Sequence, residues 1–301
     1  MELEKQRIRG NTWCVIQPRA IVPYYQLSET EIILLDSGAM LHGELEGWLD
    51  QQGLRVRAIL NTHNHWDHAA ANQRLRKEHG ARVYMPVLEA AMTSTPLSRF
   101  EGHVYGRRQK IASVCEIAPF PVDETVGLED GPVEVLGARF KVIHTPGHSL
   151  DHVAYRTPDD VLYVGDALMS DKLLRDTKIN YALNWEVDLA SKEKLRGFRC
   201  AAYVLAHGSV ETELAPLIDR NIAYVHERAA IVEHMAERPV SMEQLTRAVW
   251  EHLGLRGGNY FKDMESAHMI RALAQYLVSV GRLDCQYCDG VEYYVCCGKK
   301  G

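Results

Sequence analysis

The stretch THNHWDH, residues 62–68, follows a short β-branched run at residues 55–60 and precedes a helical pattern at residues 69–79. The run predicts a strand, so the motif lies in a strand-to-helix loop. It places His63, His65, Asp67 and His68 within six residues. Imidazole and carboxylate groups are ligands of Zn²⁺, Mn²⁺ or Fe²⁺. Alternate side chains of such a loop can face one ion and the others a second, so the stretch predicts two ions.

Further ligands follow apolar runs elsewhere in the chain. His148 lies in TPGHS, residues 145–149, Asp166 in GDA, residues 165–167, and His207 in AHG, residues 206–208. A lone histidine is usually a core or surface residue. Here, however, five histidines and two aspartates all follow the ends of predicted strands, which scattered residues would not do. The predicted metal ligands are His63, His65, Asp67, His68, His148, Asp166 and His207. The other histidines, His152 among them, do not follow this pattern, and we assign them no role.

Length and composition bound the class of protein. The 301 residues suggest two domains, or one large domain with an appendage, and 46% hydrophobic with 25% charged residues is typical of a globular chain. The first ten residues alternate charges, and no stretch approaches the ~18 apolar residues of a membrane span. We therefore expect a cytoplasmic protein with no membrane partner. Seven cysteines, an odd number, favour reduced thiols over a disulfide framework.

The chain changes character near residue 216. Up to about residue 208, short β-branched or aromatic runs alternate with turns and a few helices. Strands are predicted at residues 12–16, 31–35, 55–60, 82–85, 140–144, 152–155, 161–164 and 201–205. Residues 1–216 are therefore predicted to be a sheet-rich α/β domain, and residues 217–301 a second, helical domain.

The second domain shows three helical segments and a hairpin. Apolar residues recur at three- and four-residue steps in the first segment, and the second opens at Ser241 with Gln244 three residues on, the spacing of a capping box. A third helix is expected at about residues 264–280, and an Asp-Gly pair within residues 282–297 predicts a hairpin. Three helices followed by a hairpin is the order of a winged-helix unit.

The order HxHxDH, PGH, GD and AHG resembles that of the metallo-β-lactamase superfamily over roughly the first two hundred residues. The resemblance implies an αββα sandwich for the first domain. It assigns the first metal to His63, His65 and His148, the second metal to Asp67, His68 and His207, and the bridge between them to Asp166. Asp36 matches a strand-end aspartate common in the family, but an Asp-Ser-Gly turn explains it equally well.

Two metal ions imply hydrolysis. A water held between two cations ~3.5–4 Å apart loses its proton near neutral pH, and the bridging hydroxide attacks a carbonyl or phosphoryl group that the same cations polarise. The expected cofactors are two divalent ions, Zn²⁺ first, with Mn²⁺ or Fe²⁺ as alternatives. The expected catalytic residues are Asp67 and Asp166. The sequence has no GxSxG elbow that would supply a serine nucleophile.

Differences from the sequence patterns of individual branches limit which branch of the superfamily this chain resembles. Antibiotic-cleaving members generally lack the aspartate that stands here as Asp166, and flavin-linked diiron reductases place a carboxylate where this chain has His65. Quorum-signal lactonases usually have a tyrosine in place of Met169. The 41 positions from Asp166 to His207 leave no room for the inserted domain of RNA-3′-end-processing nucleases. The chain most resembles the glyoxalase II-like hydrolases and the lactamase-β-like group with a C-terminal winged helix, which includes thioesterases and ribonucleases.

The charge of the tail bears on the substrate. From Asp219 to Gly301 ten Lys and Arg stand against eleven Asp and Glu, a formal charge of −1, whereas a winged helix that reads nucleic acid normally has a basic face. We therefore expect a small-molecule substrate and no nucleic-acid partner, and leave a homo-oligomer open. The leading hypothesis is a dinuclear metal hydrolase of a small ester, thioester or lactone. The alternatives are a metal-dependent ribonuclease or phosphodiesterase, and a non-catalytic regulator with a vestigial metal site.

Three weaker signals stay open. The basic stretch at residues 107–110 could bind a carboxylate or phosphate of the substrate, or be a solvated charge run. Four aromatic residues could border the site or pack ordinarily: Tyr24, Tyr25, Tyr181 and Trp185. Four cysteines could bind zinc: Cys285, Cys288, Cys296 and Cys297. A two-residue hairpin turn would place the last of these on the face opposite the first, which favours incidental thiols.

Overall fold

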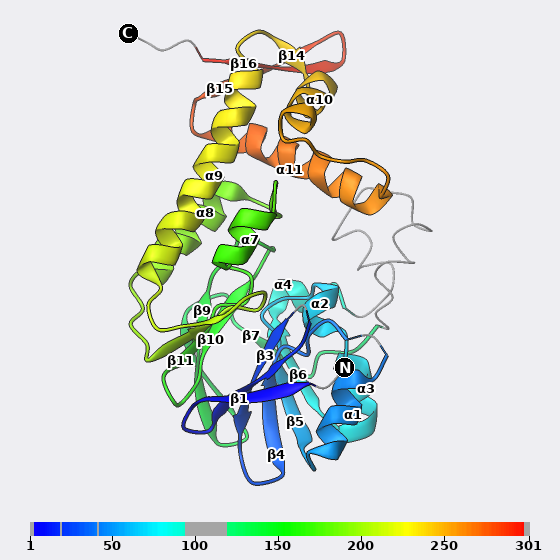
Figure 1. Cartoon of the computed structure of the whole chain (residues 1–301), viewed down its shortest axis with the longest axis vertical. Helices are drawn as coiled ribbons and strands as arrows, with labels where there is room; N and C mark the ends of the chain where they lie inside the picture. The colour runs from blue at the N-terminus through cyan, green and yellow to red at the C-terminus, as the bar shows by residue number, and fades with distance from the viewer. Residues whose placement is uncertain (1–2, 19, 41, 94–118, 298–301) are drawn as a thin grey trace.

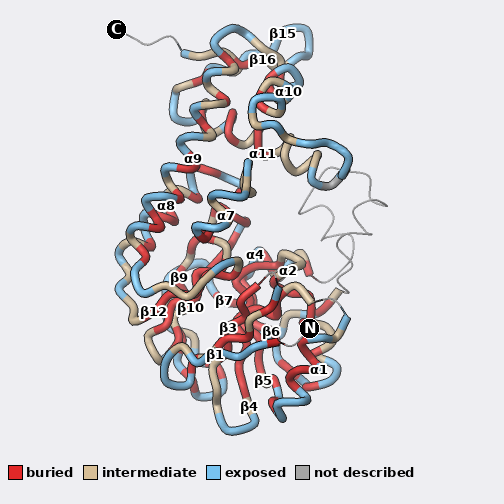
Figure 2. The backbone as a smooth tube through the Cα atoms, viewed as in Figure 1, coloured by how far each residue is buried: buried red, intermediate tan, exposed pale blue. Residues whose placement is uncertain are grey.

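The computed structural model describes residues 3–18, 20–40, 42–93 and 119–297. Two β-sheets occupy the lower half of the molecule in Figure 1, and helices flank them. The C-terminal helices and hairpin stand above the sheets in the same view. Buried residues follow the strands and the inner faces of the helices (Figure 2).

The first sheet, counted over the described residues, has seven strands in chain order. They are β1 (Glu4–Arg9), β2 (Thr12–Ile16), β3 (Ile21–Gln26), β4 (Glu31–Leu35), β5 (Arg55–Leu60), β6 (Arg82–Pro86) and β7 (Glu124–Val126). The strands from β1 to β4 pair antiparallel, and those from β4 to β7 pair parallel. Parallel pairing requires crossover connections, and helices provide them. These are α1 (Glu44–Gln51), α2 (Trp66–Ala69), α3 (Asn72–His79) and α4 (Val87–Ala90).

The second sheet has the order β13-β12-β11-β10-β9-β8. Its strands are β8 (Gly131–Val135), β9 (Ala138–His144), β10 (Val153–Arg156), β11 (Val161–Tyr163), β12 (Ala202–Val204) and β13 (Val210–Glu211). The pair β11 and β12 is parallel, and its neighbours are antiparallel. Three helices follow the later strands: α7 (Asp171–Asp176), α8 (Trp185–Leu195) and α9 (Ala215–Met235).

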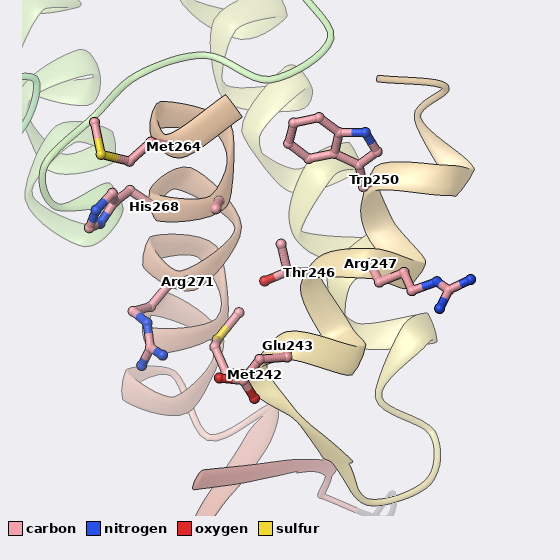
Figure 3. Close-up of a pocket in the computed structure, with 9 residues that line it drawn as sticks. Met242, Glu243, Thr246, Arg247, Trp250, Met264, His268 and Arg271 are labelled. Carbon is pink, nitrogen blue, oxygen red and sulfur yellow. The ribbon is translucent and has the colours of Figure 1, made fainter. Parts of the chain in front are cut away.

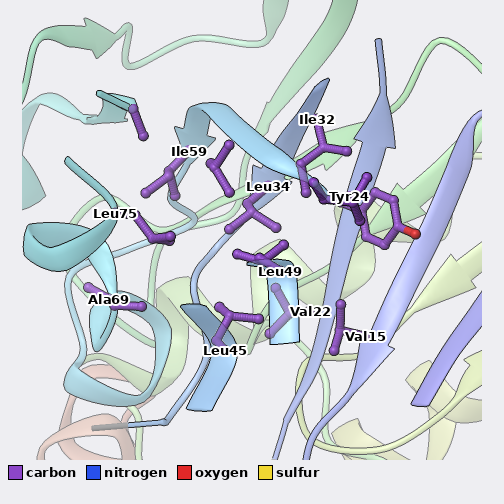
Figure 4. Close-up of a cluster of buried hydrophobic side chains, with 14 of the residues drawn as sticks. Val15, Val22, Tyr24, Ile32, Leu34, Leu45, Leu49, Ile59, Ala69 and Leu75 are labelled. Carbon is purple, nitrogen blue, oxygen red and sulfur yellow. The ribbon is translucent and has the colours of Figure 1, made fainter. Parts of the chain in front are cut away.

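Alternating side chains divide the sheets into layers. In β4, Ile32 and Leu34 belong to the cluster of buried side chains that includes Leu45 of α1 and Leu75 of α3, as Figure 4 shows. Residues Ile33 and Leu35 point the opposite way and pack against the second sheet. The outer face of that sheet is covered by α8 and α9 through side chains that include Leu195, Leu217 and Ile218. The layers are therefore helix, sheet, sheet, helix, and the predicted sandwich is confirmed.

The C-terminal elements follow the predicted order. They are α9, β14 (Val240–Ser241), α10 (Met242–His252), α11 (Tyr260–Ser279), β15 (Leu283–Cys288) and β16 (Val291–Cys296). The predicted capping box is present, since Ser241 Oγ accepts from Gln244 N and the Gln244 side chain accepts from Ser241 N. The third helix begins at Tyr260, earlier than expected, because Asn259 caps it through Lys262 N. The winged-helix type of this unit stays a prediction.

The helix α9 joins the two parts of the chain. The predicted division after residue 216 lies in its first turn, where Leu217 and Ile218 pack on the second sheet. Ala229 and Val232, further along the same helix, pack in the C-terminal core. The domain limits stay a prediction, and the structure shows a continuous helix across them. Within the described residues, none of the helices combines the length and apolarity that a membrane crossing requires.

Candidate metal centre

The predicted ligands lie just beyond strand ends of both sheets. His63, Asp166 and His207 each stand three residues after the last residue of β5, β11 and β12, and His148 stands four after β9. Because β11 and β12 run parallel, their loops leave the second sheet on one side. The loop after β5 brings His63 and His65 to the same place, and Asp67 and His68 follow in α2, so both sheets supply ligands.

The first ligand set consists of His63, His65, His148 and Asp166. One ligand atom from each lies within 4.8 Å of the others. His148 Nε2 is 3.1 Å from His65 Nδ1 and 3.3 Å from Asp166 Oδ2, and the rings of His63 and His65 are 4.4 Å apart. Four donors at these separations can surround one ion.

The second set consists of Asp67, His68 and His207, whose ligand atoms also lie within 4.8 Å of one another. His207 Nε2 is 3.3 Å from Asp67 Oδ2. Asp166 reaches this set too, with Oδ2 3.3 Å from His68 Nε2 and Oδ1 3.5 Å from His207 Nε2. The carboxylate of Asp166 therefore lies between the two sets.

Asp36 orients His68 from behind. Its Oδ2 accepts from His68 Nδ1 at 2.8 Å, from Tyr163 OH at 2.7 Å and from Thr62 Oγ1 at 2.8 Å, while Oδ1 accepts from Thr62 N at 2.7 Å. The residue is buried and has a φ of 62°, a left-handed conformation that aspartate tolerates better than most residues. A carboxylate that binds the second nitrogen of a ligand histidine fixes its ring and tautomer.

His152, which received no role from the sequence, supports Asp166. Its Nε2 accepts from Asp166 N at 3.1 Å, and its Nδ1 lies 2.9 Å from Thr145 Oγ1. Gly165 leaves room for this contact, because a Cβ there would lie 2.6 Å from His152 Nε2. The backbone of Asp166 is thus held by a buried imidazole.

Burial and charge together set the protonation of the centre. Burial would raise the pKa of Asp166, but His68, His207 and His148 hold it well below its usual range. Burial lowers the pKa of His207, yet Asp166 and Asp67 offset this and raise it to about 9. Burial also lowers the pKa of His63 well below its ordinary value, and the charge of His68 adds to this. Without metal, His207 therefore carries a proton at pH 7, while His63 is neutral.

The donor set fits divalent metal ions. His63 Nδ1 lies 2.9 Å from Thr62 Oγ1, while its Nε2 is buried and has no hydrogen-bond partner in the described part of the chain. A buried nitrogen without a partner is costly, and a metal ion would satisfy it. Five imidazoles and two carboxylates are donors that zinc and similar ions accept.

One wall of the centre comes from outside the ligand loops. The ring of Tyr181 lies 5.3 Å from that of His65 and 5.4 Å from that of His148. The next residue, Ala182, donates its N–H to Met269 Sδ of α11 at 3.2 Å. Glu265, one turn earlier on α11, faces the same way. Burial and then the charge of Asp67 raise the pKa of Glu265, so its carboxylate lies within electrostatic reach of the centre.

The weaker predictions have different outcomes. Among the aromatic residues, Tyr181 borders the centre, whereas Tyr24 packs against Trp13, Tyr25 against Phe140, and Trp185 lies in the C-terminal core. Neither candidate metal group within the described residues contains a cysteine. The basic stretch at residues 107–110 lies outside the described residues.

A hollow lies between α10 and α11, away from the candidate metal ligands. Figure 3 shows Met242 and Trp250 of α10 and Met264 and His268 of α11 around it, and its volume is about 430 Å³. Arg271 also lines it and pairs with Glu292 of β16. None of the seven predicted ligands contributes to this hollow.

Comparison with known protein families decides the classification. The family model described as the metallo-beta-lactamase superfamily matches residues 18–207, nearly two thirds of the chain. The chain belongs to this superfamily. The matched residues contain all seven predicted ligands, and the match ends at His207.

Two curated relatives show how far the sequence similarity extends. A hydroxyacylglutathione hydrolase from Maricaulis maris is 32% identical over 123 residues, which cover 40% of this chain and 37% of the relative. The probable metallo-hydrolase YqgX from Bacillus subtilis is 27% identical over 200 residues, which cover 66% of this chain and 89% of the relative. The chain thus spans well under half of the hydroxyacylglutathione hydrolase.

Two solved structures share the fold over almost the whole chain. A beta-lactamase domain protein from Burkholderia ambifaria has a TM-score of 0.71 at 17% identity and covers 97% of this chain and 93% of its own. A metallo-beta-lactamase family protein from Thermus thermophilus has a TM-score of 0.68 at 21% identity, with coverage of 91% and 93%. Coverage this complete includes the C-terminal helices.

Proposed function

We propose that this chain is a dinuclear metal hydrolase that cleaves a small ester, thioester or lactone. The observation that carries the proposal is the position of Asp166, which belongs to the first ligand set and lies 3.3 Å from His68 and 3.5 Å from His207 of the second. A carboxylate shared in this way can bridge two ions. The relatives named hydroxyacylglutathione hydrolases favour a thioester among these substrates.

The ligand assignment follows the two clusters. We assign the first ion to His63, His65 and His148, the second to Asp67, His68 and His207, and the bridge to Asp166. When bound, two divalent ions, zinc in the first place, polarise the scissile carbonyl and lower the pKa of a water between them. Asp36 keeps His68 Nε2 directed at Asp166, and His152 keeps the backbone of Asp166 in place.

The two catalytic aspartates have separate tasks. Asp166 contributes both oxygens to the ligand sets, Oδ2 toward His68 and His148 and Oδ1 toward His207. Asp67 directs Oδ2 at His207, and we assign to its carboxylate the proton of the attacking water. Tyr181, against the rings of His65 and His148, shields the first set from solvent on that side.

Charge pairing in the tail supports a small-molecule substrate rather than nucleic acid. Arg271 pairs with Glu292 on β16, and Arg282 pairs with Glu233 on α9. Cations held by carboxylates are poor donors to a phosphate backbone. The cytoplasmic location remains a prediction from the sequence, and a homo-oligomeric state remains open.

The test is a turnover screen of the metal-loaded protein against thioesters, lactones, phosphodiesters and RNA, together with elemental analysis after mild dialysis. We expect about two ions per chain, as the two clusters imply, and hydrolysis of at least one thioester, ester or lactone. A metal content that stays at one under metal-replete conditions contradicts the dinuclear assignment. Cleavage of RNA without cleavage of small esters would favour the ribonuclease alternative.

A further inference from the structure

The first ligand set is built from loops of two different sheets. His63 and His65 follow β5 in the first sheet, whereas His148 lies between β9 and β10 in the second. An ion shared by these imidazoles tolerates only a few tenths of an ångström in their separation. A feature that ties the two loops together would therefore act directly on the first metal.

Glu89 of α4 connects the two loops through hydrogen bonds. Its Oε2 accepts from Asn64 N at 3.2 Å, and Oε1 accepts from Asp151 N at 3.0 Å. Asn64 stands between His63 and His65, and Asp151 stands three residues after His148. One carboxylate thus spans both ligand loops with one oxygen on each.

Further hydrogen bonds join α4 to each of the two ligand loops. Asn64 Nδ2 also donates to the backbone oxygen of Glu89 at 3.5 Å. In return, Asp151 Oδ2 accepts from Leu88 N of α4 at 3.1 Å, and its Oδ1 lies 2.7 Å from His144 Nε2. The helix α4 and the loop of His148 therefore hold each other through side chain and backbone.

A buried carboxylate at this position lowers the stability of the fold unless its hydrogen bonds compensate for the lost hydration. Glu89 is fully buried, and no cationic side chain within the described ranges pairs with it. Burial raises its pKa, which shows the cost of the charged form. An apolar side chain would avoid this cost but would leave the backbone N–H groups of Asn64 and Asp151 without their acceptor, so the role of the carboxylate lies in its two hydrogen bonds to the ligand loops.

We propose that Glu89 is a positioning residue for the first metal, because it sets the separation between the loop of His63 and His65 and the loop of His148. The inference rests on the proposed function for the identity of the metal centre. It does not depend on which substrate is cleaved.

The test replaces Glu89 with Gln in the full-length protein. Gln keeps the size of the side chain but directs an amide NH₂ at one of the two backbone N–H groups, so one loop loses its acceptor. We expect zinc affinity to fall ~10–100-fold, the usual effect of losing a group that orients metal ligands. Zinc binding is measured by competition with a chromophoric chelator, and Co²⁺ binding by its visible bands, neither of which requires turnover.

Two further variants make the result specific. Glu46→Gln is the matched control, because Glu46 is also a buried glutamate but pairs with Arg74, away from the ligand loops. It should lower the melting temperature and leave zinc affinity unchanged. In a His207→Ala background, which disables the second set, Glu89→Gln should weaken the one remaining ion by the same ~10–100-fold factor.

The outcomes separate this inference from the proposed function. Wild-type zinc affinity in Glu89→Gln overturns the inference, as does an equal loss in Glu46→Gln. A wild-type chain that binds two ions and hydrolyses none of the substrates overturns the proposed function, while the affinity comparison still decides the role of Glu89. A wild-type chain that binds no metal overturns both.

Discussion

Replacing Asp166 with Asn tests the bridge between the two ligand sets. Asn keeps the shape of the side chain and removes its charge, which in the structure lies 3.3 Å from His68 and His148 and 3.5 Å from His207. The variant should fold, because His152 binds the backbone N–H of residue 166, which the substitution leaves in place. The question is how the lost charge acts on metal binding.

Two effects of opposite sign follow from the lost charge. Asp166 is the main cause of the pKa of about 9 at His207, so a metal ion that binds at pH 7 must displace a proton at a cost of roughly 2.7 kcal/mol, at 1.36 kcal/mol per pKa unit. The substitution removes much of this cost. It also removes an anion beside two divalent ions, and each unit of ion charge about 4 Å away contributes on the order of 4 kcal/mol at an effective dielectric constant of 20.

The second effect is the larger, because two divalent ions carry four units of charge. We expect Asp166→Asn to retain fewer than two ions after dialysis and to lose turnover by at least ~100-fold, about 2.7 kcal/mol. In the metal-free variant the pKa of His207 should fall from about 9 toward its ordinary value, which NMR titration of the histidines measures.

The matched control is Asp171→Asn, an exposed aspartate whose partner is Arg220 on the surface. It should leave metal content and turnover unchanged. Near-normal turnover of Asp166→Asn with both ions present would show that the ligand assignment is wrong. An unchanged pKa of His207 would show that the charge of Asp166 does not act on the second set.

Three further predictions follow from the same structure. The affinity of the second set for zinc should rise by more than ~tenfold per pH unit from pH 6 toward about 9, because only neutral imidazoles bind metal, His207 is protonated below its pKa of about 9, and, although burial lowers the pKa of His68, Asp166 and Asp36 raise it well above its ordinary value; a flat profile in zinc titrations across this range would contradict it. Truncation after Pro216 should lower solubility and ester turnover together, because it uncovers Trp185 and Met169, which pack against the C-terminal helices; a soluble truncation with full turnover would show that the tail is independent. No RNA affinity is expected at physiological salt, and micromolar binding that weakens steeply with added salt would reveal a phosphate-binding surface.

Much of the fold could be predicted because the buried strands carry their own signal. The predicted strands at residues 12–16, 31–35 and 55–60 match β2, β4 and β5 at both ends. The strand β1 was missed because its sequence, EKQRIR, is polar and almost fully exposed. The strand β3 was missed because it contains Pro23, which lacks the N–H that a central strand normally donates.

The helix behind the metal motif shows the limit of periodicity. Residues 69–79 were predicted as one helical stretch, but the chain forms α2 and α3 with a break between Ala69 and Asn72. In that region the carbonyl of His68 accepts from Ser37 N and Asn61 Nδ2. These long-range hydrogen bonds hold the end of the motif against two other loops, and the local pattern contains no sign of them.

The candidate ligands could be selected from the sequence for a reason that does not extend to the residues that support them. Each ligand belongs to a short motif at a strand end, whereas Glu89 and His152 are single residues whose partners lie far away in the sequence. Asp36 lies between these two cases. The sequence shows that it stands in an Asp-Ser-Gly turn, but not that it binds His68. Only the meeting of the two sheets brings such residues to the ligands.

Helices α9 and α11 connect the C-terminal part of the chain to the candidate metal centre. The start of α9 is fixed on the second sheet through Leu217, and its later turns pack with α11. The helix α11 in turn accepts the N–H of Ala182 at Met269, beside Tyr181 and the rings of the first ligand set. A displacement of the tail would therefore move Tyr181 before it moved any ligand, because the ligands follow strands of the two sheets. Changes in the tail should alter substrate binding more than metal affinity, which distinguishes them from changes at Glu89.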